Sequence, residues 1–587
     1  MPAPPDDGRR PPNITKSVVT FAFLAAASFV LGFIGLHRHL PGESLLNLFY
    51  FDLQLFVLGP DPLQDNTDGL PVSLQIARFA APAVAIFAVI ETGRVLIFAE
   101  YQRRRARRAS AHAVVCGDSP VARTLVAQLR AANRTVVVVA ERLVGTAESR
   151  QRGLMTVVGD AGDPDVLCAA GVPSAEVVYV ALGDSAVNLS VAVRASQLAE
   201  GREVPLAVYA HISDPELCVS LQARRLGLPQ PPGVRLDFFN VDDLAARVLF
   251  ERQPLPTFGE RPTRILIAGG SRLAEALLVQ AARHWRVSGG AAHPILAVDF
   301  VAPQADAAVG ALTARYPFLR RTCKITPVPV ELTIALAGGA LRTPHDRTFL
   351  CYRDENHGLK MALTTHRLWH GRPGSVFVPL YQLTDLSVAF DGGGTYPLLD
   401  QVQGRLRLFP MIQAACDPVL IGEDLVERLA RLIHEHYVLN SRRAGDGPAD
   451  SELVDWEHLD AERRRANRDQ AHDIGSKLSA IGCVVVPRID GGPLFEMTEA
   501  EIDRLAELEQ QRWKQAKERD GWRYGPTRDD ALRRSPYLLD WAEMPEEDRR
   551  KNRDAIRDLP DILADGGFEI VRLTKRQPDA QPVDACR

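Results

Sequence analysis

The chain opens with long apolar stretches, and its pattern changes near residue 110. Residues 17–36 contain no charged side chain. As a helix they would rise about 30 Å, the thickness of the hydrocarbon core of a bilayer. A second apolar stretch at 79–99 is interrupted by two charged residues. The pattern therefore predicts two transmembrane helices, at 17–36 and 74–100, joined by a loop at 37–73.

Basic residues predict how this hairpin lies in a membrane. Arginine and lysine precede residue 17, and the run RRRARR follows the second stretch at 103–108. Cytosolic flanks of membrane helices are rich in such residues. We therefore expect a cytosolic tail at 1–16, an extracytoplasmic loop at 37–73, and the bulk of the chain in the cytoplasm at the inner (cell) membrane. A signal peptide is the competing interpretation, but its apolar core is usually shorter.

The 37–73 loop bears on whether the hairpin conducts ions. A potassium-selective pore uses a TVGYG-type loop whose carbonyl oxygens replace the hydration shell of the ion. Residues 41–73 contain no such sequence. The sequence favours an anchor over a pore and leaves conduction open.

From residue 112, apolar runs of strand length alternate with helical periodicity. Residues 112–141 predict a buried strand, a glycine turn, a helix and a second strand that ends in an acid. In such a βαβ unit the helix N-terminus faces a pyrophosphate and the acid holds a ribose. Here the G-x-G-x-x-G frame reads Gly117, Ser119 and Ala122, and Glu141 stands at the acidic position.

Further strand–helix units follow in order. Gly159 and Asp160 come after the third strand, and Asp184 comes after the fourth. This succession resembles the TrkA-N domain, also called the RCK (regulator of potassium conductance) nucleotide-binding domain. We place the domain at 112–255. The resemblance implies a Rossmann-like fold, pairing of such domains in an oligomer, NAD(H) or another adenine nucleotide as cofactor, and a link to potassium ion transport.

The same pattern recurs at 262–420. The turn of this second copy has Gly269, Ser271 and Ala274, and its acid is Asp299. The Gly-Asp-Ala phrase after the third strand has no counterpart, so we expect the same fold with a degenerate nucleotide site. The cofactor-binding residues predicted for both copies are Gly117, Ser119, Ala122, Glu141, Gly159, Asp160, Asp184, Gly269, Ser271 and Asp299.

Composition excludes several classes of function. The net charge of −4 is too small for a nucleic-acid-binding face, and the eight cysteines form no CxxC pair. His366 and His370 have the four-residue spacing of a metal site, but no HExxH glutamate or third ligand accompanies them, and no group of residues looks catalytic. We therefore expect no enzyme activity, no metal and no nucleic acid.

The C-terminal part contains one charged phrase twice. Asn-Arg-Asp occurs at 467–469 and 552–554, each with a tryptophan upstream, Trp456 and Trp541. Residues 495–575 resemble the ryanodine receptor (RyR) repeat. The residues that carry this resemblance are Trp513, Gly521-Trp522, Tyr524-Gly525-Pro526, Arg528-Asp529 and Asn552-Arg553-Asp554. Residues 421–487 form a divergent repeat without the Trp-x-Tyr-Gly-Pro turn.

Two roles for this phrase remain open. The charges could pair within the helix, as at Arg550–Asp554 and Arg557–Asp561. Alternatively the repeats could form a cleft in which Asn and Arg meet an anionic ligand and aromatic rings stack on it. The ligand-binding residues predicted for the RyR repeat are Trp522, Tyr524, Arg528, Asn552 and Arg553.

Together these patterns predict an α/β chain with an N-terminal transmembrane helical hairpin, two tandem Rossmann-like doubly wound domains and a mainly helical RyR-repeat pair. We expect a membrane-anchored, ligand-sensing regulatory homo-oligomer associated with potassium ion transport, with an ion-transport subunit as a partner. The alternative is a stress or antiviral membrane effector whose RyR repeats sense a nucleotide second messenger.

Overall fold

The computed structural model describes residues 14–57, 70–141, 154–226, 233–258, 261–289, 294–341, 343–370, 374–381, 386, 389–390, 399–423, 425–444, 453–454, 456–489, 491–527, 529 and 531–573. They belong to two compact units. The first takes its described residues from Met1–Val114 and Thr135–Ala175, and the second from Val115–Arg134 and Glu176–Arg587.

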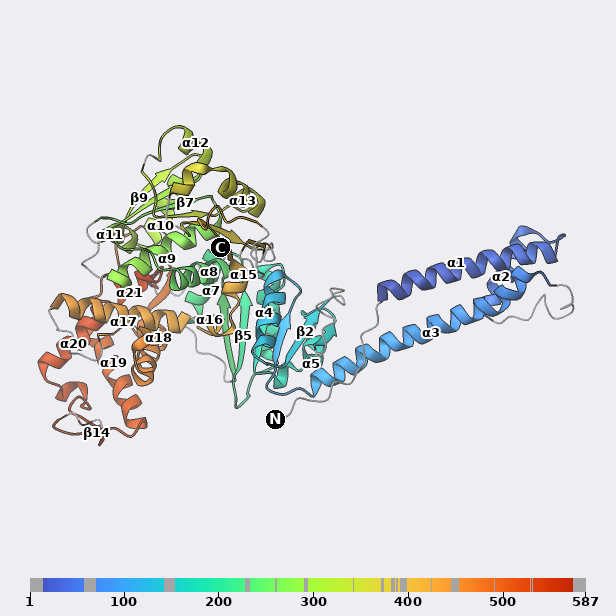
Figure 1. Cartoon of the computed structure of the whole chain (residues 1–587). Helices are drawn as coiled ribbons and strands as arrows, with labels where there is room; N and C mark the ends of the chain where they lie inside the picture. The colour runs from blue at the N-terminus through green and yellow to red at the C-terminus, as the bar shows by residue number, and fades with distance from the viewer. Residues whose placement is uncertain are drawn as a thin grey trace, which may run out of the picture. The chain divides into compact units, whose positions relative to one another are not determined.

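Three helices form the N-terminal hairpin. They are α1 (Ile14–His39), α2 (Leu45–Phe56) and α3 (Val72–Arg107), and α1 lies alongside α3 in Figure 1. Their shared core contains Leu36, Leu48 and Leu74. By length and composition, Phe21–His39 and Val72–Ile90 are able to cross a membrane. The segment at 37–73, predicted as an extracytoplasmic loop, contains α2, a mostly apolar helix with three polar residues, Asn47, Asp52 and Gln54.

Helix α3 continues well past its apolar part and packs on the first Rossmann-like domain. Arg103 donates from Nη2 to the carbonyl oxygen of Val158 at 3.0 Å. Gly171 has a φ of +77°, and a Cβ there would lie 2.7 Å from the carbonyl oxygen of Ala106. A glycine is therefore needed at this position for both its conformation and the close approach of α3.

The first Rossmann-like domain contains a six-stranded sheet with the strand order β3-β2-β1-β4-β5-β6. Its strands are β1 (Ala113–Cys116), β2 (Val136–Ala140), β3 (Met155–Val158), β4 (Val177–Val180), β5 (Leu206–His211) and β6 (Val234–Phe239). The accompanying helices are α4 (Pro120–Ala131), α5 (Pro164–Ala169), η1 (Val172–Ser174), α6 (Ser185–Gln197), α7 (Pro215–Leu226) and α8 (Val241–Arg252). The pairs β2–β3, β4–β5 and β5–β6 are parallel. Strands buried on both faces read as continuous apolar runs, as β1, β2 and β4 do.

The second sheet repeats that order as β9-β8-β7-β10-β11-β12. Its strands are β7 (Arg264–Ala268), β8 (Leu296–Val301), β9 (Cys323–Val328), β10 (Arg347–Leu350), β11 (Val376–Leu380) and β12 (Leu406–Pro410). The helices around it are α9 (Arg272–Gly289), α10 (Ala305–Arg315), α11 (Phe318–Thr322), α12 (Leu332–Ala337), α13 (Glu355–Thr364), η3 (His366–His370) and α15 (Met411–Ala415). The next helix, α16 (Pro418–Gly422), contacts α4. The two sheets of equal strand order confirm the predicted duplication of a Rossmann-like fold.

The C-terminal region contains two similar successions of elements. The first has α17 (Leu425–Ala444), η4 (Trp456–His458), α18 (Ala461–Ala480) and β13 (Cys483–Pro487). The second has α19 (Glu499–Arg519), β14 (Arg523–Tyr524), β15 (Arg534–Ser535), η5 (Trp541–Glu543), α20 (Glu546–Arg557), α21 (Leu559–Asp565) and β16 (Phe568–Arg572). Strands β13 and β16 pair antiparallel, and both copies share one apolar core. The repeats therefore form one folded body.

Candidate functional site

The first glycine turn lies where the strand order of the first sheet reverses, between β1 and β4. Gly117 has a φ of +119°, and a Cβ there would lie 2.5 Å from the carbonyl oxygen of Ala181. Ala181 in turn donates its amide to the carbonyl of Cys116 at 2.9 Å. The turn is thus held against the end of β4, and only glycine fits this conformation and this contact. Open α/β sheets bind ligands beyond the carboxyl ends of their strands at such a reversal.

Ser119 fixes the start of α4. Its hydroxyl accepts from the amide of Ala122 at 3.1 Å and donates to the carbonyl oxygen of Ala181 at 2.6 Å. Pro120 occupies the first turn of the helix and has no N–H to offer. The predicted residues Gly117, Ser119 and Ala122 therefore lie together, with part of their hydrogen-bonding capacity used inside the turn.

Two predicted acids follow strands of the first unit and are exposed. Glu141 comes directly after β2. Asp160 lies beyond β3, and its Oδ1 accepts from the amide of Gly162 at 2.7 Å. The amide of Gly159, between β3 and Asp160, donates to the carbonyl of Ala140 at 3.0 Å. Gly159 and Asp160 thus form a turn beside the end of β2.

Asp184 is exposed and caps α6 by accepting from the amides of Ala186 and Val187 at 2.8 and 3.0 Å. One turn later, the wholly buried Asn188 has a role that sequence reasoning missed. Its Oδ1 accepts from the amide of Leu182 at 2.7 Å, and its Nδ2 donates to the carbonyl of His211 at 2.8 Å. Asn188 thereby joins the carboxyl ends of β4 and β5. The signal available in the sequence was an Asn four positions after Asp184, within an otherwise mostly apolar helix.

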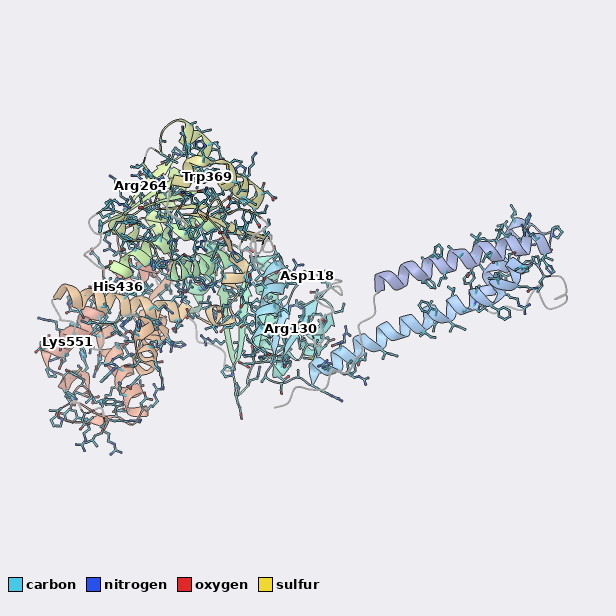
Figure 2. All side chains as sticks on the ribbon, in the orientation of Figure 1. Asp118, Arg130, Arg264, Trp369, His436 and Lys551 are labelled. Atoms are coloured by element: carbon cyan, nitrogen blue, oxygen red, sulfur yellow. The ribbon has the colours of Figure 1, made fainter. Side chains whose placement is uncertain are left out.

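The second copy keeps the turn and uses its acid differently. Gly269 has a φ of +112°, and a Cβ there would overlap the carbonyl of Cys351. Ser271 accepts weakly from the amide of Ala274, with an Oγ–N distance of 3.4 Å. Asp299 lies within β8, where it accepts from Arg264 at 2.9 Å and bonds His345 at 2.7 Å. Arg264 is labelled in Figure 2.

These partners determine the charge of Asp299. Burial alone would raise the pKa of its carboxyl, but the hydrogen bonds from His345 and Arg264 outweigh burial and lower that pKa below the usual range. Because Asp299 is almost completely buried and already satisfied, its contacts are those of an internal ion pair.

In both C-terminal repeats, the arginine of the Asn-Arg-Asp phrase joins its helix to the first helix of the same repeat. Arg468 bonds Glu427, with Nη2 and Oε1 3.0 Å apart, and lies 6.0 Å from the ring centre of Trp456. Arg553 bonds Asp503 at 2.5 Å and lies 5.7 Å from the ring centre of Trp541. The two copies therefore share one arginine–acid–tryptophan arrangement.

One of the ion pairs predicted within the helix of the second phrase is replaced by other contacts. Arg557 bonds Asp554 and Glu499, at 2.8 and 2.7 Å, in place of the expected Arg557–Asp561 pair. Asn552 donates to Gln510 at 3.3 Å, and Arg553 also bonds Glu546 at 2.5 Å. These contacts lie within the second repeat and follow the intramolecular interpretation of the phrase.

The aromatic turn of the second repeat forms a separate feature. Trp522 is buried, and the ammonium of Lys517 lies 4.6 Å from its ring centre. Tyr524 is 57% exposed on β14, which pairs with β15. In the described part of this repeat, no hydrogen bond joins Trp522 or Tyr524 to Asn552 or Arg553. Arg528 lies outside the described residues.

Charged residues also fill the boundary between the repeats. Lys477 of α18 pairs with Glu509 of α19, and Arg512 bonds the same carboxylate at 2.6 Å. Burial would raise the pKa of Glu509, but these two cations outweigh burial and lower it. The inner faces of the repeats therefore hold a satisfied ion cluster. Among the described residues, no group of His, Cys, Asp and Glu is arranged to hold a metal ion.

Comparisons with known proteins agree with the two resemblances seen in the sequence. The TrkA-N domain model matches residues 113–228, and the RyR domain model matches residues 493–572. The first match covers β1 to the helix after β5, including the turn at Gly117. The second covers the complete second repeat, including Trp522 and Asn552.

Similar solved structures include the "GsuK Channel", at 17% identity and a TM-score of 0.34, covering 70% of this chain and 99% of that chain. The "GsuK channel bound to NAD" is 14% identical, with a TM-score of 0.35 and coverages of 81% and 87%. The "Crystal structure of the GsuK bound to ADP" is 17% identical, with a TM-score of 0.34 and coverages of 70% and 98%. From the family models and the geometry together, the chain contains a TrkA-N domain at 113–228 and a RyR domain at 493–572.

Proposed function

We propose that this chain is a membrane-anchored sensor of a nucleotide or related small ligand, and that its ligand state regulates potassium ion transport. One observation carries the proposal. The TrkA-N match spans the reversal of strand order between β1 and β4, where Gly117 contacts Ala181. Asp184 and Asn188 lie at the carboxyl ends of the neighbouring strands. Such an edge is where doubly wound sheets bind nucleotides.

The first domain is the proposed binding domain because its acids remain accessible. Glu141 and Asp160 are exposed after β2 and β3, whereas Asp299 of the second copy is buried in an internal ion pair. An exposed carboxylate after the second strand suits a ribose diol. NAD(H), ATP and ADP-ribose are therefore the first ligands to test.

Helix α3 supports the membrane part of the proposal. Its N-terminal half is apolar enough to cross a membrane, and the same helix reaches Arg107 without interruption. Near its C-terminal end, Arg103 bonds the carbonyl of Val158, the residue before Gly159. A change in the Gly159–Asp160 turn would therefore act directly on the helix that enters the membrane.

Calorimetry on the purified full-length chain tests this proposal. We expect one of NAD(H), ATP or ADP-ribose to bind, and Glu141→Gln to weaken its affinity about tenfold, the cost of one charge-assisted hydrogen bond. The matched control is Glu200→Gln, which removes an exposed carboxylate at the end of α6. Equal affinities for the wild type and Glu141→Gln would place the ligand elsewhere.

The second candidate function is that of a membrane effector whose RyR repeats sense a nucleotide second messenger. It is favoured by Tyr524, which is exposed beside the buried Trp522 in a turn that the first repeat lacks. A transport regulator changes potassium flux through a partner without harming the cell. An effector depolarises cells when its ligand appears, so an unchanged membrane potential under that ligand would contradict it.

We also propose that the chain regulates transport without enzyme activity of its own and that it assembles into a homo-oligomer. Both rest on the TrkA-N resemblance. Analytical ultracentrifugation of the detergent-solubilised chain tests the oligomer, and an NAD(P)H turnover assay tests for enzyme activity.

A further inference from the structure

The N-terminal hairpin contains a buried acid, Asp52, that has no counter-ion among the described residues. Asp52 lies near the C-terminal end of α2, between the two helices that are long enough to cross a membrane. Its exposed fraction is 0%, and in the part of the chain that the structure describes neither of its carboxylate oxygens has a hydrogen-bond partner. The buried residues that α2 shares with it are Leu48 and Leu55, so the carboxyl lies in an apolar core.

The backbone of α1 is shaped to accept this carboxyl group. A Cβ at Gly32 would overlap Oδ1 of Asp52 and would lie 3.1 Å from its Cγ. Ser28, one helical turn before Gly32, is also buried. A side chain larger than hydrogen at position 32 is therefore incompatible with the position of Asp52. The acid is packed into a recess of the hairpin and does not merely lie near its surface.

The charged and titratable groups on all three helices leave Asp52 without a counter-ion in the described part of the hairpin. On α1 they are His37, Arg38 and His39, in the last turn. Before α2, Glu43 bonds Asn47 at 2.8 Å. On the apolar part of α3, Arg78 lies over the ring of Phe79 at 4.8 Å. None of these groups forms an ion pair with Asp52.

A bare carboxylate in such surroundings is very costly, because its charge lies in an apolar core and none of the described cations pairs with it. Its neutral form costs far less. We propose that Asp52 is a proton-binding site: the carboxylic acid form keeps α2 seated in the recess at Gly32, and loss of the proton releases α2 from α1. This inference concerns the hairpin alone and is independent of which ligand the cytosolic domains bind.

Infrared difference spectroscopy on the full-length chain, in nanodiscs of phosphatidylcholine and phosphatidylglycerol, tests the proposal. At neutral pH we expect a protonated-carboxyl band that is absent from Asp52→Asn and still present in Glu43→Gln, which removes an exposed acid beside α2. A wild-type spectrum that matches Asp52→Asn in this region would overturn the proposal.

Chemical labelling of the unmodified chain gives a second answer that depends on no variant. A hydrophobic carbodiimide adds to the protonated form of a carboxyl group in an apolar environment and leaves a mass increase on the modified peptide. We expect label on the peptide that contains Asp52, and loss of that label when Gly32→Ala displaces the acid. Label on other acids without label on Asp52, or undiminished label in Gly32→Ala, would refute the site.

The Asp52 experiments and the ligand-binding experiments test different parts of the chain. Ligand binding by the TrkA-N or RyR domain is measured by calorimetry and does not depend on Asp52. Failure of the carboxyl test would therefore leave ligand sensing intact, and failure of ligand binding would leave the proton site intact.

Discussion

Arg286 and Asp565 form a buried ion pair, with Nη1 of the arginine 2.5 Å from Oδ2 of the aspartate. Arg286 lies on α9 of the second Rossmann-like domain, and Asp565 ends α21 of the RyR domain. His436 of α17, labelled in Figure 2, bonds the same Oδ2 at 2.8 Å. One carboxylate thus connects the second Rossmann-like domain with both C-terminal repeats.

Removal of the Arg286 charge should destabilise the folded chain. Breaking one side of a buried pair commonly costs about 3–5 kcal/mol, because it leaves the other charge uncompensated. We therefore expect Arg286→Gln to lower the free energy of unfolding by an amount of this order in denaturant titrations. Arg321 lies 3.8 Å from the same aspartate but is 64% exposed, so Arg321→Gln should cost less than about 1 kcal/mol. Equal effects of the two variants would contradict the role of Arg286.

The same carboxylate should make stability dependent on acid. Burial alone would raise the pKa of Asp565, but His436 and Arg286 outweigh burial and lower it from 3.8 to about 2. A carboxyl whose pKa is lowered by folding contributes stability that is present above the unfolded pKa and lost as the pH falls through the folded pKa.

We therefore expect the wild type to lose roughly 2 kcal/mol at this site between about pH 5 and pH 2. The comparison is the pH dependence of unfolding in wild type, Asp565→Asn and Asp561→Asn, of which only Asp565→Asn should lack this component. If the free energy of unfolding of the wild type and of Asp565→Asn fell equally with pH, Asp565 would not be the source of the acid sensitivity.

The order of strands and helices could be predicted from the local sequence pattern. Strands buried on both faces give short continuous apolar runs, whereas helices with one apolar face give apolar residues every three or four positions. The second sheet was predictable because Gly269 repeats Gly117 of the first copy. In both sheets this glycine lies in contact with the end of a neighbouring strand, where a larger residue does not fit. Helix α2 lies inside the segment predicted as a loop, and at twelve residues it is too short to span a bilayer by itself. Contacts such as Arg286–Asp565 join residues far apart in the chain, and no spacing rule identifies them. The pairing of Arg553 with Asp503 of α19, 50 residues earlier in the chain, was hidden for the same reason.

The packing of α3 against the first domain predicts a specific effect at Gly171. Alanine there is strained by the φ of +77° and also meets the carbonyl of Ala106. Gly201 has a similar φ of +81°, but a Cβ would meet nothing within 4 Å. Both variants should lose about 1–2 kcal/mol from backbone strain. Only Gly171→Ala should also increase hydrogen exchange in residues 101–107, and equal exchange in the two variants would contradict the contact.

The first glycine turn allows a similar comparison. Gly117→Ala combines a φ of +119° with a Cβ 2.5 Å from the carbonyl of Ala181. A Cβ at Gly183, two residues beyond Ala181, would meet nothing within 4 Å. We expect Gly117→Ala to lower the melting temperature of the chain and Gly183→Ala to leave it nearly unchanged. Unaltered melting of Gly117→Ala would show that the turn tolerates a side chain, contrary to the geometry.

The two repeats should differ in ligand binding if the RyR domain senses a nucleotide. Trp522→Ala and Tyr524→Ala alter the turn that only the second repeat contains. Trp456→Ala alters the buried tryptophan of the first repeat. We expect the first two variants to weaken binding about tenfold or more through lost stacking, and Trp456→Ala to retain it. Tyr524→Ala is the cleaner variant because its side chain is exposed. Loss of binding in Trp456→Ala alone would reverse the assignment.

The central claim is that the chain senses a nucleotide-type ligand through its TrkA-N domain. Native mass spectrometry of the full-length protein, followed by thermal melting with NAD(H), ATP and ADP-ribose, tests it most directly. A ligand that binds only the folded state raises its stability in proportion to the logarithm of ligand concentration. We predict a co-purified or added nucleotide that raises the melting temperature of the wild type and raises it less in Glu141→Gln. No bound nucleotide, and no shift with any of the three at saturating concentration, would contradict the claim.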